Sequence, residues 1–253
     1  CTGGDISRTA ILDNFCWGAL DTPEQFGELV KACNACYDTA KIYKTPFISG
    51  KDSLNNKYLM ENGDTVSITS SLLISAVSVI EDIRKCITMD LKADKNALYL
   101  IGVTRDEFPP SVRPKVSYRQ MQLLQRAIGK ELLLSCHDCS EGGLAVALAE
   151  MSFSGGLGAE INLKSIPHEI TNGKNGLEIQ LLFSETNSRF IAEVSPGNEK
   201  EFIRCMKGVR CVRIGHVTRE KKFRIKGMKD EILLDADTMS LKDVWQNALV
   251  KKL

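Results

Sequence analysis

The segment His137-Asp138-Cys139-Ser140-Glu141-Gly142-Gly143-Leu144 decides the fold that we expect for this chain. Residues 131–136 before it are mostly apolar and predict a buried strand, and residues 144–151 are strong helix formers and predict a helix. A strand, a polar turn with glycines and a helix N-terminus are typical of an anion site, because free N–H groups and the positive end of the helix dipole face the turn. Asp138 and Glu141 would repel a bare phosphate, so the segment also favours a metal ion between protein and anion.

A purely structural interpretation of the same segment is open at this point. Ser140 would be the N-cap of the helix, and Gly142 and Gly143 would supply the backbone freedom of a tight turn. Two glycines before a helix are common, so these residues alone do not decide between a capped helix and a binding site.

The composition limits the class of protein. A chain of 253 residues can form one large domain or two smaller ones, each with its own core. Its 32 acidic and 33 basic residues are balanced and form no basic stripe or acidic tail, so we expect neither nucleic acid nor an anionic membrane as a partner. The longest apolar run, residues 72–80, contains serines and is too short to cross a bilayer.

Nine cysteines are scattered along the chain, which favours reduced thiols in a cytoplasmic protein over a disulfide scaffold. Two Cys-x-x-Cys pairs, Cys33/Cys36 and Cys136/Cys139, leave a shared zinc site as one interpretation. The other interpretation, which we favour, makes Cys33 and Cys36 small hydrophobic residues of a helix and Cys136 the end of a buried strand.

Two further polar segments follow predicted strands. The strand at residues 8–12 ends at Asp13-Asn14, and ligand contacts in α/β folds lie just beyond the carboxyl ends of strands. A second, short strand leads into the polar loop Ser49-Gly50-Lys51-Asp52-Ser53-Leu54-Asn55-Asn56. A phosphate-binding Walker loop is excluded, because Thr45 and Asp52 stand where that motif needs a glycine and a hydroxyl residue. Taken alone, the loop favours a solvated hairpin turn.

Strands and helices alternate along the chain, which indicates an α/β (α+β) protein. A charged connector around Lys95 predicts a boundary between two units, 1–94 and 95–253. The main elements that we expect are a helix from about Thr22, one or two strands over 66–80, strands at 97–102 and 190–194, a helix over 118–128, a loop-rich segment over 164–178 and a terminal helix over 241–249.

Four segments of the chain together resemble one known family: Ile11–Gly18, Pro46–Leu54, His137–Met151 and Leu182–Phe190. In this order and at these intervals the set is similar to the synthetase subunit of phosphoribosylformylglycinamidine synthase, and the likeness covers essentially all 253 residues. The resemblance implies the aminoimidazole ribotide synthetase-like fold, with the later part of its second N-terminal ATP-binding half in 1–94 and its second C-terminal half in 95–253. The start at Cys1, without a methionine or a signal sequence, leads us to expect a piece of a longer protein.

The resemblance also implies an activity. The family is an ATP-dependent carbon–nitrogen ligase of purine biosynthesis, which converts formylglycinamide ribonucleotide, ATP and ammonia from glutamine into formylglycinamidine ribonucleotide, ADP and phosphate through an iminophosphate. The implied cofactors are ATP and Mg²⁺. The implied partners are a glutaminase subunit or domain, a small accessory subunit and the remainder of the synthetase chain. We assign no catalytic residue and expect the isolated chain to be inactive, because the family's catalytic histidine is expected outside it.

Two other functions stay open. One is a non-catalytic, structural nucleotide-binding module of the same enzyme, since a two-copy architecture can hold a nucleotide structurally in one of its related sites. The other is a sister synthetase or kinase of the same fold, such as selenophosphate synthetase. The segments Asp13–Gly18 and Gly50–Ser53 argue against this last assignment.

The resemblance implies site roles position by position. ATP contacts are implied at Asp13, Gly50 and Ser140 (with Ser140 also open as a substrate contact), substrate contacts at Lys51, Ser53, Gly142 and Gly143, and Mg²⁺ ligands at Asp138 and Asp52. Asp138 is a hard oxygen ligand suited to Mg²⁺, and Gly50 allows close approach of the backbone. Many family members carry asparagine in place of Lys51. A protonated lysine cannot bind Mg²⁺, so we expect Lys51 to contact phosphate and Asp52 to substitute as a metal ligand.

Two features keep more than one interpretation. His137 would either donate to a phosphate or pack at the end of its strand. The segment Glu185–Arg189 would form either a loop of the active site or an ion-paired turn before the strand at 190–194. No thiol has an evident base partner, so no cysteine is a candidate nucleophile.

Overall fold

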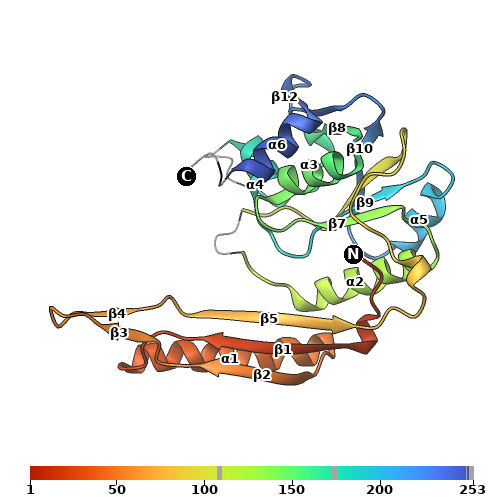
Figure 1. Ribbon diagram of the computed structural model, residues 1–253. Coiled ribbons are helices and arrows are strands. Elements are labelled where there is room, and N and C mark those ends of the chain that lie inside the picture. Colours follow the sequence, from red (N-terminus) through yellow and green to blue (C-terminus); the bar gives the residue numbers. More distant parts are fainter. Residues whose placement is uncertain (107–109, 172–175, 249, 251–253) are drawn as a thin grey trace. The chain divides into compact units, whose positions relative to one another are not determined.

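The computed structural model describes residues 1–106, 110–171, 176–248 and 250. Over these residues the contacts divide the chain into two compact units, Gly4–Glu81 and Asp82–Leu253, with Cys1–Gly3 joined to the second. Helices and strands are mixed along the chain (Figure 1), which confirms the expected α/β (α+β) class. None of the helices in these ranges has the length and the apolar surface that a membrane span requires.

The segment 82–94 lies with the second unit. The Leu91 side chain is 2% exposed in the core of that unit, and the Leu91 N–H donates to the Met151 carbonyl oxygen at 3.1 Å. The assignment of domains to 1–94 and 95–253 remains a prediction.

The described part of the first unit is a three-stranded sheet with one long helix (Figure 1). β1 (Thr9–Cys16) is the central strand, with β2 (Phe47–Ser53) parallel on one side and β5 (Ser71–Ser78) antiparallel on the other. α1 (Pro23–Tyr43) connects β1 to β2, as a parallel pair requires. The short elements are η1 (Ile6–Arg8) and the strands β3 (Lys57–Leu59) and β4 (Thr65–Ser67), which pair with each other.

α1 begins where the sequence predicts. The Thr22 hydroxyl accepts from the Gln25 N–H at 3.4 Å, and the Gln25 side-chain oxygen accepts from the Thr22 N–H at 3.0 Å. This reciprocal capping box satisfies N–H groups at the helix start, while Pro23 in the first turn has no N–H to satisfy. The helix ends at Tyr43, and Lys44 follows in the left-handed conformation.

The interpretation of Ser49–Asn56 as a polar loop is wrong for its first part. β2 continues to Ser53 and pairs with β1 in parallel register, with Gly50 opposite Asp13. β1 satisfies the backbone N–H and C=O groups of these polar residues. The strand propensity of single residues does not predict such a contact between distant segments. Only residues 54–56 leave the strand.

Among the described residues, the second unit is built on a seven-stranded sheet of order β12-β11-β8-β10-β6-β9-β7. β6 (Ala97–Ile101) and β9 (Phe190–Val194) are buried at every position, and they confirm the strands expected at 97–102 and 190–194. The other strands are β7 (Ser135–Asp138), β8 (Gly158–Asn162), β10 (Cys211–Thr218), β11 (Lys222–Lys226) and β12 (Ile232–Asp237). β8 and β11 run parallel, and the other neighbouring pairs run antiparallel.

Helices cover both faces of this sheet (Figure 1). Leu98 and Leu100 of β6 share an apolar cluster with side chains of α3 (Gly143–Gly155) and α4 (Leu177–Phe183). Tyr99 lies in a second cluster, with side chains of α2 (Pro114–Gly129) and α5 (Glu199–Cys205). Because successive side chains of a strand point to opposite faces, β6 is apolar throughout when both faces are covered. The remaining elements are α6 (Thr238–Asn247), η2 (Ile83–Lys85) and η3 (Leu163–Ser165).

The strand expected at 131–136 starts later, at Ser135. Leu132 and Leu133 are buried in the same cluster as α2, but they lie in the turn that follows this helix. A buried turn shows the same short apolar run as a buried strand, so the sequence pattern did not separate the two.

Other expected elements are present. The helix expected at 118–128 lies within α2, and the expected terminal helix corresponds to α6. Residues 172–175 of the expected loop 164–178 and residue 249 of the expected terminal helix lie outside the described residues.

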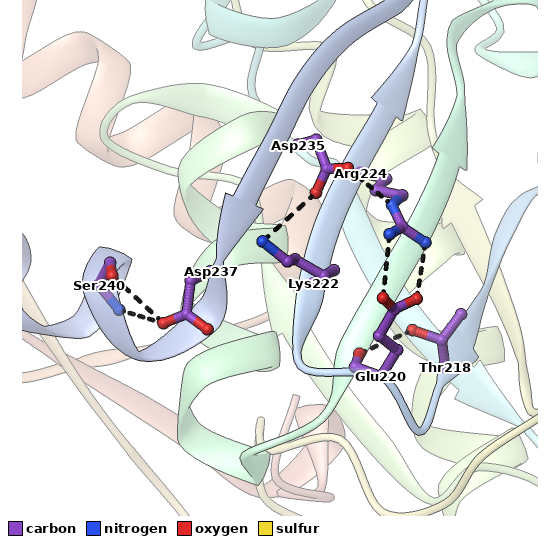
Figure 2. Close-up of polar contacts among 7 residues, drawn as sticks. All are labelled: Thr218, Glu220, Lys222, Arg224, Asp235, Asp237 and Ser240. Carbon is purple, nitrogen blue, oxygen red and sulfur yellow. Dashed lines mark hydrogen bonds and ion pairs between the residues drawn. The ribbon is translucent and has the colours of Figure 1, made fainter.

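The outer edge of the second sheet carries a network of ion pairs on the hairpin of β11 and β12 (Figure 2). The two terminal nitrogens of Arg224 donate to the two Glu220 carboxylate oxygens at 2.8 and 3.1 Å, and its Nε donates to Asp235 at 3.1 Å. Asp237 then starts α6 by accepting from the Ser240 N–H at 2.9 Å. These exposed polar groups hold the hairpin and the following helix start locally, and none of them is a candidate site residue.

Candidate functional site

The turn between β7 and α3 holds the residues that the sequence singled out. β7 ends at Asp138, and the Cys139 N–H donates to the Arg189 carbonyl oxygen at 2.9 Å. α3 begins with Gly142 as its N-cap, and no side chain makes the cap hydrogen bond from that position. The interpretation of Ser140 as the N-cap is therefore wrong. Its carbonyl oxygen accepts from the Gly143 N–H at 3.0 Å and closes the turn.

Glu185 closes the start of α3. One of its carboxylate oxygens accepts from the Gly142 N–H at 2.9 Å. A negative group is favoured there, because the N–H groups and the dipole of a helix start attract anions. The Gly142 N–H, a candidate substrate contact, is thus held by a carboxylate of the chain itself. The sequence left the role of Glu185 open, because the two partners are far apart along the chain.

The two glycines of the turn are both required by its geometry. Gly142 has a φ of 74°, and a β-carbon there would lie 2.4 Å from Val146 Cγ2. Gly143 has a φ of 67°, and a β-carbon there would lie 2.5 Å from the Ser184 carbonyl oxygen. The turn therefore packs directly on the loop 184–189, and two of the polar segments picked out in the sequence meet here.

Arg189 holds the loop 184–189 from the inside. Its side chain is among the fully buried ones, at 1% exposure, and burial lowers the pKa of the guanidinium. Nε donates to the Thr186 carbonyl oxygen at 3.1 Å, and the terminal nitrogens donate to the Thr104 hydroxyl at 3.0 Å and to the Ser184 carbonyl oxygen. Within the described ranges neither Arg189 nor Glu185 forms an ion pair, so the interpretation of this segment as an ion-paired turn is wrong.

His137 lies between two carboxylates at the end of β7. Its Nε2 contacts Glu150 Oε2 at 2.9 Å, and its Nδ1 lies 3.5 Å from Asp138 Oδ1. Glu150 also accepts from the indole N–H of Trp245 at 3.2 Å. The contact with Asp138 raises the pKa of His137, burial opposes this effect, and Glu150 adds to the rise. His137 is thus packed and partnered at the strand end, which leaves it no free ring nitrogen for a phosphate.

Asp138 has the character of a metal ligand. Its side chain is 53% exposed, and the contact with His137 lowers the pKa of the carboxyl group, which keeps it ionised at neutral pH. Among the residues that the structure describes, no group of three or more His, Cys, Asp and Glu side chains could hold a metal ion. Mg²⁺ is commonly held by one or two carboxylates together with phosphate oxygens and waters. Asp138 therefore fits an ion that arrives with a nucleotide.

The cysteine pairs do not gather into a metal site within the described part of the chain. Burial raises the pKa of the Cys136 thiol to about 11 and that of the Cys139 thiol to about 12. Thiols that stay protonated are poor zinc ligands, which supports the interpretation of Cys136 as a packed residue. On α1, Cys36 is partly buried, but Cys33 is exposed and does not pack as a small hydrophobic residue.

In the first unit, the two candidate ATP contacts lie side by side. Asp13 of β1 is opposite Gly50 of β2, and a β-carbon at position 50 would lie 2.3 Å from Asp13 Oδ1. The Asp13 carboxylate therefore lies directly over the backbone of Gly50. Space, rather than an unusual backbone angle, requires glycine at this position.

The alternation of side chains along β2 sorts the candidate residues of the first unit into two sets. Gly50 and Asp52, which share a face with Asp13, are candidate ATP and metal contacts. Lys51 and Ser53, on the opposite face, are candidate substrate contacts. β2 is an edge strand of the described sheet, so groups on both of its faces can be reached from one side.

Asn56 is a residue of this region that the sequence analysis did not single out. Its side-chain N–H group donates to the carbonyl oxygens of Trp17 at 2.9 Å and Ser53 at 2.7 Å. Its side-chain oxygen accepts from the Ser53 hydroxyl at 3.0 Å. Asn56 therefore fixes the end of β2 and orients the Ser53 hydroxyl. An asparagine three residues after a strand-end serine is the only signal of this role in the sequence.

The structure thus brings the candidate residues together in two groups, one in each unit. The first unit holds Asp13, Gly50, Lys51, Asp52 and Ser53, and the second holds Asp138, Ser140, Gly142 and Gly143. The site of the second unit is a strand, a glycine-bearing turn and a helix start next to an ionised aspartate. Together with a mixed sheet covered by helices on both faces, this arrangement defines an α/β protein with a candidate anion site.

The family follows from a direct match. Residues 96–227, just over half of the chain, match the family described as AIR synthase related protein, C-terminal domain, and the chain belongs to this family. The aminoimidazole ribotide synthetase-like fold that the resemblance implied is thereby confirmed.

The matches to known PurL proteins extend beyond residues 96–227 and include most of the chain. A similar sequence is that of phosphoribosylformylglycinamidine synthase subunit PurL from Lactobacillus helveticus (strain DPC 4571), with 32% identity over an alignment of 256 positions that covers 95% of this chain and 32% of that protein. Similar structures from Thermotoga maritima each cover 95% of this chain. PurLQS has a TM-score of 0.73 and 15% identity, and 38% of that chain is covered. PurL complexed with ATP has a TM-score of 0.71 and 14% identity, with 38% of that chain covered. PurL complexed with FGAR has a TM-score of 0.70 and 15% identity, with 40% of that chain covered. At these identities the structures show a shared fold, and the chain spans about a third of its sequence relative.

Proposed function

We propose that this chain is part of an ATP-dependent carbon–nitrogen ligase that forms formylglycinamidine ribonucleotide from formylglycinamide ribonucleotide, ammonia and ATP in purine biosynthesis. The observation that carries the proposal is the 32% identity with a PurL protein along 95% of the chain. The shared fold with PurL complexed with ATP and with FGAR supports it.

The proposal concerns a whole enzyme to which this chain contributes one part, since the chain spans 32% of its relative. The other parts are the remainder of the synthetase, a glutaminase that supplies ammonia and a small accessory subunit, and the fold shared with PurLQS supports such an assembly. A cytoplasmic location belongs to the same proposal, because scattered, unpaired cysteines suit a reducing compartment.

The reaction makes defined electrostatic demands. The substrate amide oxygen attacks the terminal phosphorus of ATP, ADP leaves, and ammonia then displaces phosphate from the iminophosphate. Charge develops on the oxygens of the phosphoryl group, so the enzyme must supply a metal ion, N–H donors and cations at fixed positions. Mg²⁺, when bound, supplies charge neutralisation of the phosphoryl oxygens. Asp138, ionised and exposed at the end of β7, is the residue of the second unit that would hold it, and Asp52 is the candidate in the first unit.

The other candidate residues have roles that follow from their positions. Lys51 and Ser53 share a face of β2 and offer a cation and a hydroxyl to the substrate. Asp13 and Gly50, on the other face, offer a carboxylate and an open backbone to the nucleotide. Ser140 lies in the turn before α3, where its hydroxyl would contact the nucleotide.

An anion at the start of α3 must replace Glu185. The Gly142 N–H is the donor that such an anion would take, and the Gly143 N–H is already used within the turn. In this proposal Glu185 swings away when phosphate enters, and its exposed position leaves room for that movement.

The closed helix start also favours a second candidate function, a structural nucleotide-binding module of the same enzyme. A carboxylate on Gly142, and the absence among the described residues of a group of three or more metal-binding side chains, are compatible with a nucleotide that is held and not turned over. The full-length protein distinguishes the two functions. Loss of turnover in Asp138→Ala with structural nucleotide still bound supports the catalytic role, and retained turnover with loss of that nucleotide supports the structural one.

Calorimetric titration of the chain with ATP tests the nucleotide site directly, in the presence and absence of Mg²⁺. We expect Asp138→Asn to weaken the Mg²⁺-dependent binding by about tenfold or more, because it removes a charged metal ligand. Asp94→Asn, an exposed aspartate outside the site, is the matched control and should bind like the wild type. Equal affinities of Asp138→Asn and the wild type would refute the assignment of Asp138 to the metal.

A further inference from the structure

Glu150 of α3 joins three elements of the second unit at one carboxylate. Its Oε2 lies 2.9 Å from Nε2 of His137 on β7, the residue before Asp138. Its Oε1 accepts from the indole N–H of Trp245 on α6 at 3.2 Å. The Trp245 ring also packs on Phe153 of α3, with the ring centroids 5.6 Å apart. Both oxygens of Glu150 therefore have a partner, and the carboxylate is held from two sides.

This carboxylate fixes the position of the imidazole. The side chains of His137 and Glu150 are 17% and 22% exposed, so the atoms around them limit their movement together with the contact itself. A histidine whose one ring nitrogen contacts a carboxylate has its ring orientation set by that contact. With Nε2 held by Glu150, the other ring nitrogen, Nδ1, lies 3.5 Å from Asp138 Oδ1.

Asp138 is the last member of this series of contacts. Its side chain is 53% exposed, so its conformation is restricted less by packing than by the ring beside it. A metal ligand is commonly oriented by residues that do not touch the ion, and loss of such a residue lowers metal affinity or activity by about 10- to 100-fold. Glu150 stands in this relation to Asp138, with His137 between them.

We propose that Glu150 is a positioning residue, which acts through His137 to orient Asp138 for a Mg²⁺ ion that arrives with the nucleotide. The inference rests on the proposed function, because it requires Asp138 as the metal ligand. A merely structural role of Glu150, the attachment of α6 to α3, makes a different prediction. Its replacement would then lower stability and leave the Mg²⁺ dependence of nucleotide binding unchanged.

Calorimetric titration of the chain with ATP, with and without Mg²⁺, separates these two roles. Glu150→Met removes both acceptor oxygens and keeps a good helix former. We expect it to weaken the Mg²⁺-dependent binding by about tenfold and to leave binding without Mg²⁺ unchanged. The matched control is Glu201→Met on α5, which removes an exposed glutamate paired with Lys130 at 3.2 Å and should bind like the wild type.

A second variant keeps the test decisive if Glu150→Met does not fold. Glu150→Gln preserves the size and polarity of the side chain, but it has a single acceptor oxygen for the two donors, His137 and Trp245. We expect it to weaken the Mg²⁺-dependent binding by about threefold, as the loss of one hydrogen bond does.

The Asp138→Asn background shows whether Glu150 acts through Asp138. In that background Glu150→Met should cause no further loss of Mg²⁺-dependent binding, because effects that pass through one ligand are not additive. The inference is overturned if a folded variant at position 150 keeps the Mg²⁺ dependence of the wild type, or if Glu150→Met weakens binding by the same factor with and without Asp138. When Asp138→Asn is weakened and Glu150→Met is not, the positioning role alone fails. When Asp138→Asn also binds like the wild type, the metal assignment fails with it.

Discussion

Gly143 shows how much of the turn before α3 depends on single residues. Its φ of 67° and the 2.5 Å that would separate a β-carbon from the Ser184 carbonyl oxygen leave no room for a side chain. We expect Gly143→Ala to lower the free energy of unfolding by about 1–3 kcal/mol, through backbone strain and displacement of the loop 184–189. Thermal unfolding measures the effect. Gly129→Ala, where a β-carbon meets nothing within 4 Å, is the matched control and should leave Tm unchanged or slightly raised.

His137 makes the stability of the second unit depend on pH. Its pKa is raised in the folded state, chiefly by Asp138, so its contribution is complete below the unfolded pKa of about 6.5 and is lost as the pH rises through the folded value. The difference in Tm between the wild type and His137→Gln should therefore be largest at about pH 6 and shrink as the pH rises above neutrality. A difference that stays constant across this range would contradict the proposed contact of a protonated His137 with Asp138 and Glu150.

At the scale of residues, the sequence could indicate a candidate anion site before α3, but it could not indicate that Glu185 occupies the start of this helix. Gly142 and Gly143 were identified as turn residues, and their positive φ angles confirm the reason. The prediction that Ser140 is the N-cap of α3 was wrong, because Gly142 occupies the N-cap position. The contact of Glu185 with the Gly142 N–H joins segments 43 residues apart, and local patterns carry no information on such a pair.

Among the elements, the parallel pair β1 and β2 places Asp13 over Gly50. Gly50→Ala should push the Asp13 carboxylate aside and weaken ATP binding by about tenfold, since the two groups are proposed to share the nucleotide. Titration calorimetry of the chain with ATP measures this change. Gly27→Ala on α1, where a β-carbon meets nothing within 4 Å, should bind ATP like the wild type. Unchanged affinity in Gly50→Ala would remove this pair from the nucleotide site.

The loop between α4 and β9 depends on the buried side chain of Arg189. Arg189→Met should lower the free energy of unfolding by about 2–4 kcal/mol, because it leaves the carbonyl oxygens of Ser184 and Thr186 buried with one donor fewer. Urea unfolding gives this difference. Arg213→Met removes an exposed arginine paired with Glu199 and should change stability by no more than about 0.5 kcal/mol. If both variants lost a similar amount of unfolding free energy, the buried contacts of Arg189 would contribute no more to stability than an exposed ion pair does.

Elements with strong local signals could be predicted, and elements made by tertiary contacts could not. α1 has a capping box and β9 is apolar at four of its five positions, and both were expected where they lie. The polar residues Ser49–Ser53 become a strand only because β1 lies beside them, and Leu132 and Leu133 mimic a strand because their turn is buried. In both places the environment outweighs the intrinsic preference of the residues.

For the whole molecule, order and spacing of segments carried more information than composition. The four segments that resemble one family predicted the AIR synthase-like fold, and the match of residues 96–227 confirms it. The candidate residues fall into one group in each of the two units, and the chain covers 32% of its sequence relative. Under the proposed function, completion of a catalytic site depends on parts of the enzyme that lie beyond these groups, which no pattern within this chain could describe.

The central claim is that this chain supplies the metal ligand Asp138 to an amidine-forming ligase. Its most direct test is the rate of amidine formation by the complete protein that contains the chain, with formylglycinamide ribonucleotide, ATP, Mg²⁺ and ammonia. We predict that Asp138→Asn lowers kcat by about 100-fold or more with an unchanged fold, and that Asp94→Asn keeps the wild-type rate. Turnover by Asp138→Asn at the wild-type rate, or no amidine formation by the wild-type protein, would contradict this account.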